Sequence, residues 1–155
     1  MYNVTILDGV DVTLLRLLRD RPRLPIAELA RLADVARGTA QARLNRLEAA
    51  GVITGYGPDL DLEALGYGVL AFITLQIAQG QDGVVVDGLG EIAEVLEVYA
   101  VTGTADLSCR VVARSNDHLH EVIRAILHIP GIQRTETQLA LGSRIRRTAL
   151  DLVIA

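Results

Sequence analysis

The sequence has few of the residues that mark secreted, membrane-bound or metal-binding proteins. Cys109 is the only cysteine among 155 residues, so no intrachain disulfide can form, as is usual in a reducing compartment. The N-terminus has no basic-then-apolar leader, and no apolar run is long enough to cross a bilayer. These absences predict a soluble cytoplasmic protein without a membrane partner.

Lysine is absent, so all 15 basic residues are arginine, and aromatic residues make up only 3% of the chain. The charge is unevenly distributed. Residues 1–51 carry eight arginines against six acidic residues, and residues 52–155 carry seven against thirteen. A basic N-terminal third joined to an acidic remainder suits a nucleic-acid-binding module attached to a second domain.

Residues 25–51 have the pattern of two short helices joined by a tight turn. In the first helix the inward positions are Ile26, Leu29, Ala30 and Ala33, at helical spacing. In the second they are Ala36, Ala40, Leu44 and Leu47. Gly51 ends this helix in the left-handed conformation. Only Asp34 and Val35 remain for the turn, which favours a helix-turn-helix motif.

The opposite face of the second helix carries small, amide and arginine side chains. Small residues permit a close approach to another surface, while Asn or Gln matches an adenine edge and Arg matches guanine. This face predicts binding to the major groove of double-stranded DNA, and the alternative is an ordinary solvated helix face. The candidate DNA-binding residues are Arg37, Gly38, Thr39, Gln41, Ala42, Arg43, Asn45 and Arg46.

An earlier helix completes this unit. Asp8 is placed to cap it, with Asp11 in the capping-box position three residues later. Leu14, Leu15 and Leu18 form its apolar stripe, and Arg21-Pro22 ends it. Three helices in about fifty residues are marginally stable alone, which argues for a partner domain or a second copy.

After Gly51 the pattern changes. Residues 52–58 predict a short strand, either a wing or the start of a linker, and the domain boundary falls near Gly66. The remainder alternates in the order β-α-β-β-α-β, which is a ferredoxin-like arrangement. Its expected strands are 69–77, 95–101, 107–113 and 132–141, with a glycine-rich, poorly specified helix in 79–90 and a helix that Ser115-Asn116 cap and Ile129-Pro130-Gly131 end.

The chain is therefore predicted to be an α+β protein. Residues 1–51 form a winged-helix-like helix-turn-helix domain, 52–66 a strand linker, and 67–155 a ferredoxin-like βαββαβ domain. The last residues, after Gly142, either add an edge strand or pack on a second subunit. The sheet has helices on one face only, so its other face needs cover. Strand residues such as Leu70, Phe72 and Leu75 offer apolar surface on both sides of the sheet, and we therefore expect a symmetric dimer through this domain.

The sequence contains few motifs that could bind a metal or a cofactor or carry out catalysis. His118, His120 and His128 could suggest a metal site, but positions two apart on a helix do not share a face, so His118 and His120 cannot both bind a metal readily. The chain also has a single cysteine and no clustered carboxylates nearby. Cys109 lies in an alternating strand as a small buried side chain. Gly88-x-Gly90 lacks the third glycine of a dinucleotide loop. We expect no catalytic residues, no metal and no cofactor.

Six stretches in the correct order resemble the Lrp/AsnC (feast/famine) family of prokaryotic transcriptional regulators. The resemblance covers Leu7 to about Leu141. The matching stretches are LDGVD at 7–11, ELA at 28–30, RLNRLEAAGVITGY at 43–56, LGY at 65–67, VTGTAD at 101–106 and IPGIQRTET at 129–137.

The resemblance implies a DNA-binding regulator that forms homodimers and often octamers, and whose C-terminal domain senses an amino acid or related small molecule. Three departures stand out. Asp34-Val35-Ala36 replaces the Gly-Leu-Ser that the family usually has before the recognition helix. Residues 80–90 are unusually rich in glycine, and the tail after Gly142 matches little.

Asp106 follows a glycine-bearing turn between two apolar strands. It either caps the hairpin through backbone N–H groups or, as the resemblance favours, binds the ammonium group of an amino acid. In the second case backbone N–H groups near Gly103 bind the carboxylate, because glycine permits close approach. The candidate effector-binding residues are Tyr99, Val101, Thr102, Gly103, Thr104, Asp106, Thr135 and Thr137.

Two functions from different classes remain open on the sequence. One is an effector-responsive transcriptional regulator. The other is a metabolite-binding or enzymatic ferredoxin-like protein whose helical domain only mediates assembly. The basic N-terminal third and the small and amide side chains of its outward helix face favour the regulator.

Overall fold

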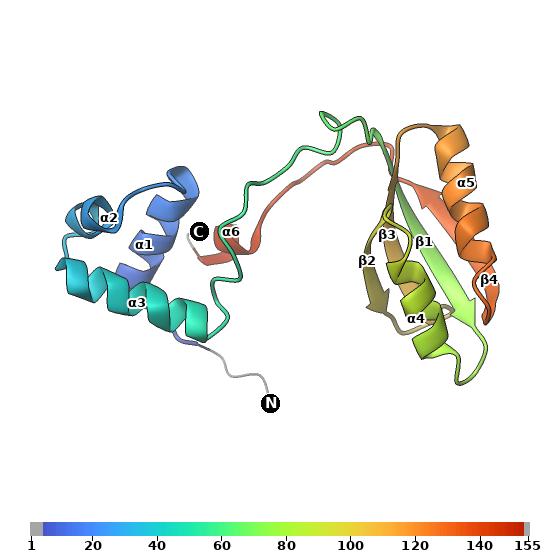
Figure 1. Ribbon diagram of the computed structural model, residues 1–155, viewed down its shortest axis with the longest axis horizontal. Coiled ribbons are helices and arrows are strands. Elements are labelled where there is room, and N and C mark those ends of the chain that lie inside the picture. Colours follow the sequence, from blue (N-terminus) through green and yellow to red (C-terminus); the bar gives the residue numbers. More distant parts are fainter. Residues whose placement is uncertain (1–4, 154–155) are drawn as a thin grey trace. The chain divides into compact units, whose positions relative to one another are not determined.

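The computed structural model describes residues 5–153 of the chain (Figure 1). These residues form two compact units. The first contains the residues up to Pro58 together with those from Ile145 onward, and the second is Asp59–Arg144. No helix among the described residues is long and apolar enough to cross a membrane.

The first unit is built on three helices, α1 (Gly9–Asp20), α2 (Ile26–Leu32) and α3 (Arg37–Ala49). Their apolar stripes meet in one core, which confirms the helix-turn-helix prediction. One inward position was wrong: Ala36 is exposed, because it is the extended N-cap residue of α3 and its side chain caps nothing. The buried members of the core are Leu14, Leu29, Ala30, Ala40 and Leu44.

Helix α1 begins with the predicted capping box. One carboxylate oxygen of Asp8 accepts from the backbone N–H groups of Val10 and Asp11, both at 3.0 Å. In return the Asp11 carboxylate accepts from the backbone N–H of Asp8 at 3.0 Å. Two carboxylates thus bind N–H groups that would otherwise lack partners in the first turn of a helix.

The connection between the units contains no strand in the structure, so the predicted strand at 52–58 was wrong. Each end of the connection is anchored to the nearer unit instead. At the start, the Tyr56 hydroxyl donates to Glu48 on α3 at 2.6 Å. At the end, the Arg114 guanidinium lies 5.1 Å from the centre of the Tyr67 ring and donates to its hydroxyl at 3.1 Å. Gly55 and Gly57 have no side chain to pack and Pro58 has no N–H to donate to a neighbouring strand, so this segment does not favour a strand.

The tail does not join the sheet. Its short helix α6 (Ala149–Val153) belongs to the helical unit and contacts α1. Arg19 on α1 lies 3.4 Å from the Asp151 carboxylate, and Asp151 also accepts from the backbone N–H of Thr148 at 2.7 Å. The expectation that residues from 145 onward belong with the ferredoxin-like domain therefore differs from the contacts observed.

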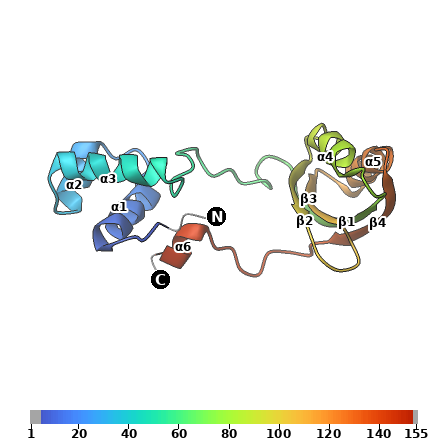
Figure 2. The same ribbon diagram turned by 90° about the horizontal axis from the view of Figure 1, so that it is seen from below.

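The second unit has the predicted ferredoxin-like order. Its strands are antiparallel, in the spatial order β2-β3-β1-β4. Both helices lie on one side of the sheet (Figure 2). The elements are β1 (Val69–Ile77), α4 (Asp82–Gly90), β2 (Val95–Ala100), β3 (Leu107–Ala113), α5 (Asn116–Leu127) and β4 (Ile132–Leu139).

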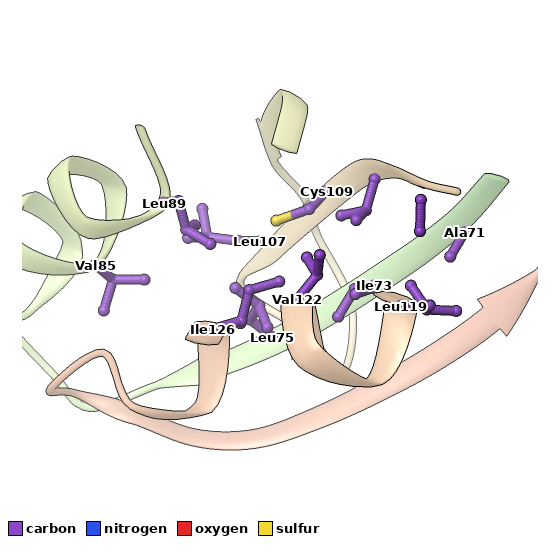
Figure 3. Packing of buried hydrophobic residues seen from close by; sticks show 12 residues of the cluster. Ala71, Ile73, Leu75, Val85, Leu89, Leu107, Cys109, Leu119, Val122 and Ile126 are labelled. Carbon is purple, nitrogen blue, oxygen red and sulfur yellow. The ribbon is translucent and has the colours of Figure 1, made fainter. Parts of the chain in front are cut away.

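The core of this unit lies between the sheet and the two helices (Figure 3). Ile73 and Leu75 from β1, Cys109 from β3 and Ile126 from α5 are all fully buried. Helix α4 forms despite its glycines because Val85 and Leu89, four positions apart, are buried in this core. Burial raises the pKa of the Cys109 thiol to about 11, which suits a packing role.

The register divides the side chains of the sheet between two faces. Residues paired directly across antiparallel strands point to the same face. Phe72 pairs with Arg110 and Gln138, and these three lie on the face opposite the helices, which we call the open face. Phe72 keeps 42% of its surface exposed there. Leu75, by contrast, points into the helix-covered core, so only Leu70 and Phe72 of the three apolar residues named above serve the open face.

Candidate DNA-binding surface and effector site

The outward face of α3 carries the small and amide side chains that the sequence placed there. Thr39 and Ala42 are exposed, and a Cβ added to Gly38 would meet no atom within 4 Å. The Gln41 amide donates to the Asn45 carbonyl oxygen at 2.8 Å. The two amides therefore present one linked group of donors and acceptors to solvent.

The three arginines of α3 have different surroundings. Arg37 is exposed at the N-terminal end of the helix and makes no ion pair with a residue in 5–153. Arg43 binds Asp8, and its Nη1 also lies 3.2 Å from Asp11. Arg46 binds Asp11 through Nη2 at 2.5 Å. Two of the three candidate DNA-binding arginines thus have partners inside the domain.

These contacts shift the pKa values of both carboxyls. The hydrogen bond from Arg43, followed by that from the Asp11 backbone, lowers the pKa of Asp8 to about 2. Burial raises the pKa of the Asp11 carboxyl, but the Asp8 N–H and the two arginines outweigh burial and hold this pKa below its usual value. Asp11 has no exposed surface, so it is a buried, ionised and fully paired carboxylate.

A hollow of about 620 Å³ lies beside this cluster. Three of the residues that line the hollow have small side chains. Gly38 and Ala42 take up little space, and Thr39 supplies a hydroxyl. The lining residues are Asp8, Gly38, Thr39, Ala42, Arg43 and Arg46. Five of the six are candidate DNA-binding residues, so the structure brings them together on one surface.

The TGTAD turn joins β2 to β3 as predicted, with Gly103 at φ 113°. Asp106 fastens the turn to β1. Its backbone N–H donates to the Leu75 carbonyl at 2.9 Å, and its Oδ2 accepts from the Ile77 N–H at 2.8 Å. The carboxylate therefore caps a backbone group, on the neighbouring strand rather than in the hairpin itself. Its Oδ1 accepts nothing from a described residue.

The other candidate effector-binding residues do not share one face. Tyr99 pairs with Ser108, on the open face, and its hydroxyl donates to Glu97 at 2.8 Å. Thr135 pairs with Leu75 and Thr137 with Ile73. Because Leu75 and Ile73 point into the core, both threonines lie on the helix-covered face. The structure therefore does not bring Thr135 and Thr137 together with Tyr99.

A second hollow, of about 220 Å³, adjoins the turn on the open face. Thr104 and Ala105 form one wall, and the Gln76 amide donates to the Thr104 carbonyl at 2.6 Å. Arg134 and Glu136 contribute one cation and one anion, and neither is paired with another described residue. The lining residues are Thr74, Leu75, Gln76, Thr104, Ala105, Arg134 and Glu136.

Sequence reasoning missed two parts of these sites. Asp8 and Asp11, which bind Arg43 and Arg46, were predicted only as capping residues of α1. No local sequence pattern shows that the start of α1 lies against α3. Arg134 and Glu136 were missed as well. Their alternation with Thr135 and Thr137 was a signal, but it does not show which of the two faces lies beside the turn.

Comparison with known proteins identifies the class. A family model described as Lrp/AsnC ligand binding domain matches residues 70–150, and one described as winged helix-turn-helix DNA-binding matches residues 7–54. The first match covers most of the sheet unit and continues into the tail, and the second lies within the helical unit. The chain belongs to the Lrp/AsnC family of DNA-binding transcriptional regulators, as the sequence predicted.

Individual relatives cover nearly the whole chain. The regulatory protein AsnC of Escherichia coli is 35% identical over 92% of this chain and 95% of its own length. HTH-type transcriptional regulator FL11 of Pyrococcus horikoshii is 30% identical over 94% of this chain and 97% of its own length.

Solved structures of transcriptional regulators are also similar to this chain over most of its length. The structure of E. coli AsnC has a TM-score of 0.86 at 34% identity, covering 94% of this chain and 99% of that one. A transcriptional regulator from Neisseria meningitidis in complex with L-Met has a TM-score of 0.81 at 26% identity, covering 93% and 95%.

Proposed function

We propose that this regulator reads its DNA site with the outward face of α3 and responds to a free amino acid through the TGTAD turn, without a catalytic step. The observation that carries the first part is the linked Gln41–Asn45 pair, which lies on an exposed helix face beside the small residues Gly38 and Ala42. Such amides match base edges in the major groove. Arg37 is exposed to bind phosphate, which positions the helix on the duplex.

Assembly follows from the open face of the sheet. Phe72 and Tyr99 expose 42% and 55% of their surfaces there, on a sheet whose other face is covered by helices. A second copy of this chain would cover these residues in a symmetric dimer, and octamers would then form from dimers. A dimer would present two α3 helices to half-sites about 34 Å apart, or a multiple of that distance.

The effector part rests on the geometry of the turn. Asp106 retains one carboxylate oxygen, Oδ1, without a partner among the described residues, and this oxygen would accept from an ammonium group. Gly103 and Thr104 are exposed residues, and their backbone N–H groups would donate to a carboxylate. The hollow of about 220 Å³ beside Thr104 has room for a small side chain. The regulator of N. meningitidis described above holds L-Met, which supports a ligand of this class.

A gel-shift titration on the DNA upstream of the protein's own gene tests the DNA-binding face. Replacing Gln41 and Asn45 by alanine should remove discrimination between that DNA and a duplex of random sequence, because each bidentate base contact contributes about 1–3 kcal/mol. Replacing Glu63 by alanine, in the other unit, is the matched control. Retained discrimination in the double variant would exclude this face of α3 as the reading surface.

A further inference from the structure

Asp11 contacts more groups than a helix-capping residue requires. Its Oδ2 accepts from the Asp8 N–H and from Arg46, while its Oδ1 accepts from Arg43. Capping needs only the first of these bonds. The other two bring a pair of guanidinium groups, three positions apart on α3, to the two oxygens of one carboxylate.

Burial makes this arrangement rigid. The Asp11 side chain is fully buried, whereas 29% of Arg43 and 47% of Arg46 is exposed. If the two arginines moved away, a buried charge would be left unpaired, at a large cost in free energy. The Asp11 carboxylate therefore holds both guanidinium groups in place. Without it, the two guanidiniums on one helix face would repel each other and move apart in solvent.

Each guanidinium group is bound through only one of its nitrogens. Arg43 uses Nη1 and Arg46 uses Nη2 for all the bonds that either makes to described residues. A guanidinium has five N–H donors, so most donors of both groups remain for another acceptor. Both residues line the hollow of about 620 Å³ beside α3. Because Gly38 and Ala42 in its lining are small, the sugar-phosphate backbone of DNA could approach the helix closely.

We propose that Asp11 is a positioning residue for DNA binding. It fixes Arg43 and Arg46 by one end each, and their remaining donors bind a backbone phosphate that enters this hollow. Asp8 has the opposite effect: its carboxylate is 53% exposed, lies at the same hollow and repels the phosphate. The inference rests on the proposed DNA-binding face of α3.

The test compares Asp11→Asn with Asp8→Asn in the full-length protein, by DNA affinity as a function of salt. Asparagine keeps an oxygen for capping and removes the charge. For Asp11→Asn we expect affinity to fall at least about tenfold, with a salt slope smaller by one to two, since each ordered phosphate contact adds about 0.9. Asp8→Asn should bind DNA at least as tightly as the wild type.

The salt slope separates positioning from stability. If Asp11 only supports the fold, DNA affinity should fall in proportion to the fraction of folded protein, and the salt slope should not change. Circular dichroism measures the folded fraction. That result overturns the proposal, as does an Asp11→Asn variant that binds like the wild type. An equal loss in Asp8→Asn also overturns it, because capping would then explain both.

If Asp11→Asn does not fold, Arg46→Lys replaces it. A single ammonium group cannot bind Asp11 and a phosphate with two separate edges, so affinity and slope should both fall, and unchanged values overturn the proposal. The Gln41/Asn45 double variant provides the remaining distinction. If that variant loses discrimination while Asp11→Asn behaves like the wild type, only this inference fails, and the proposed reading face stands.

Discussion

Asp34 and Gly51 end successive helices with the same pattern of hydrogen bonds. Both have positive φ, 54° at Asp34 and 70° at Gly51. After α2, the N–H groups of Asp34 and Val35 donate to Arg31 and Ala30. After α3, those of Gly51 and Val52 donate to Glu48 and Leu47. Each is a Schellman motif, in which glycine is the preferred residue at the left-handed position.

Asp34→Gly should therefore stabilise the protein. An L-residue in the left-handed conformation costs roughly 1–2 kcal/mol, less for Asp than for most, and the greater freedom of glycine in the unfolded chain offsets part of the gain. We expect the free energy of unfolding in urea to rise by about 0.5–1 kcal/mol. Gly51→Asp should lower it, and a loss in both variants would argue against strain at Asp34.

The glycines of α4 allow a matched pair of substitutions. A Cβ at Gly83 would meet no atom within 4 Å, whereas one at Gly88 would lie 2.9 Å from Cγ2 of Ile129. Alanine favours helix over glycine by up to about 1 kcal/mol. Gly83→Ala should thus raise the melting temperature and Gly88→Ala should lower it. Equal increases would mean that Ile129 moves without cost.

The pattern of the sequence was enough to predict these two helix-ending turns, the capping box and the strands at 69–77 and 107–113, because each depends on neighbouring residues. It did not predict how distant segments meet. The pairing of Asp11 with Arg46 joins residues 35 apart, and the contact of Arg19 with Asp151 joins residues 132 apart. Such contacts depend on the packing of whole helices, which no local periodicity specifies.

The helix-turn-helix should lose stability in acid as Asp8 is protonated. The folded-state pKa of Asp8 is about 2, against an ordinary value of 3.8. Its ionised form therefore contributes stability above about pH 4, and that contribution is lost as the pH falls through about 2. We expect the difference in stability between wild type and Asp8→Asn to shrink over this range. A difference independent of pH would mean that charge at Asp8 does not stabilise the fold.

Dimerisation through the open face predicts opposite results for two apolar surface residues. Phe72 on β1 is 42% exposed, and Val84 on α4 is 49% exposed on the helical side. A charge at a covered apolar position is costly to bury. Sedimentation should therefore show monomers for Phe72→Asp, whereas Val84→Asp should keep the dimer through the open face and sediment as a dimer or a larger assembly of dimers. Dimers that survive Phe72→Asp would place the interface elsewhere.

The effector site gives the last prediction, and Asp106→Asn is the variant that tests it. Alanine would remove the bond from the Ile77 N–H and disturb the turn itself. Asparagine can still accept that bond while it removes the charge that an ammonium group needs. Any change in ligand binding then reports on charge rather than on folding.

We expect a panel of amino acids to include at least one that raises the melting temperature of the wild type and not that of Asp106→Asn. A charge-assisted hydrogen bond contributes about 1.5–3 kcal/mol, so the ligand should bind the variant about ten- to a hundredfold more weakly. Arg134→Gln is the companion variant at the adjoining hollow. A ligand that stabilises Asp106→Asn as much as the wild type, but fails with Arg134→Gln, would move the site from the turn to that hollow. If DNA affinity of the wild type responds to the same ligand, and that of the insensitive variant does not, effector binding and DNA binding are coupled in one protein.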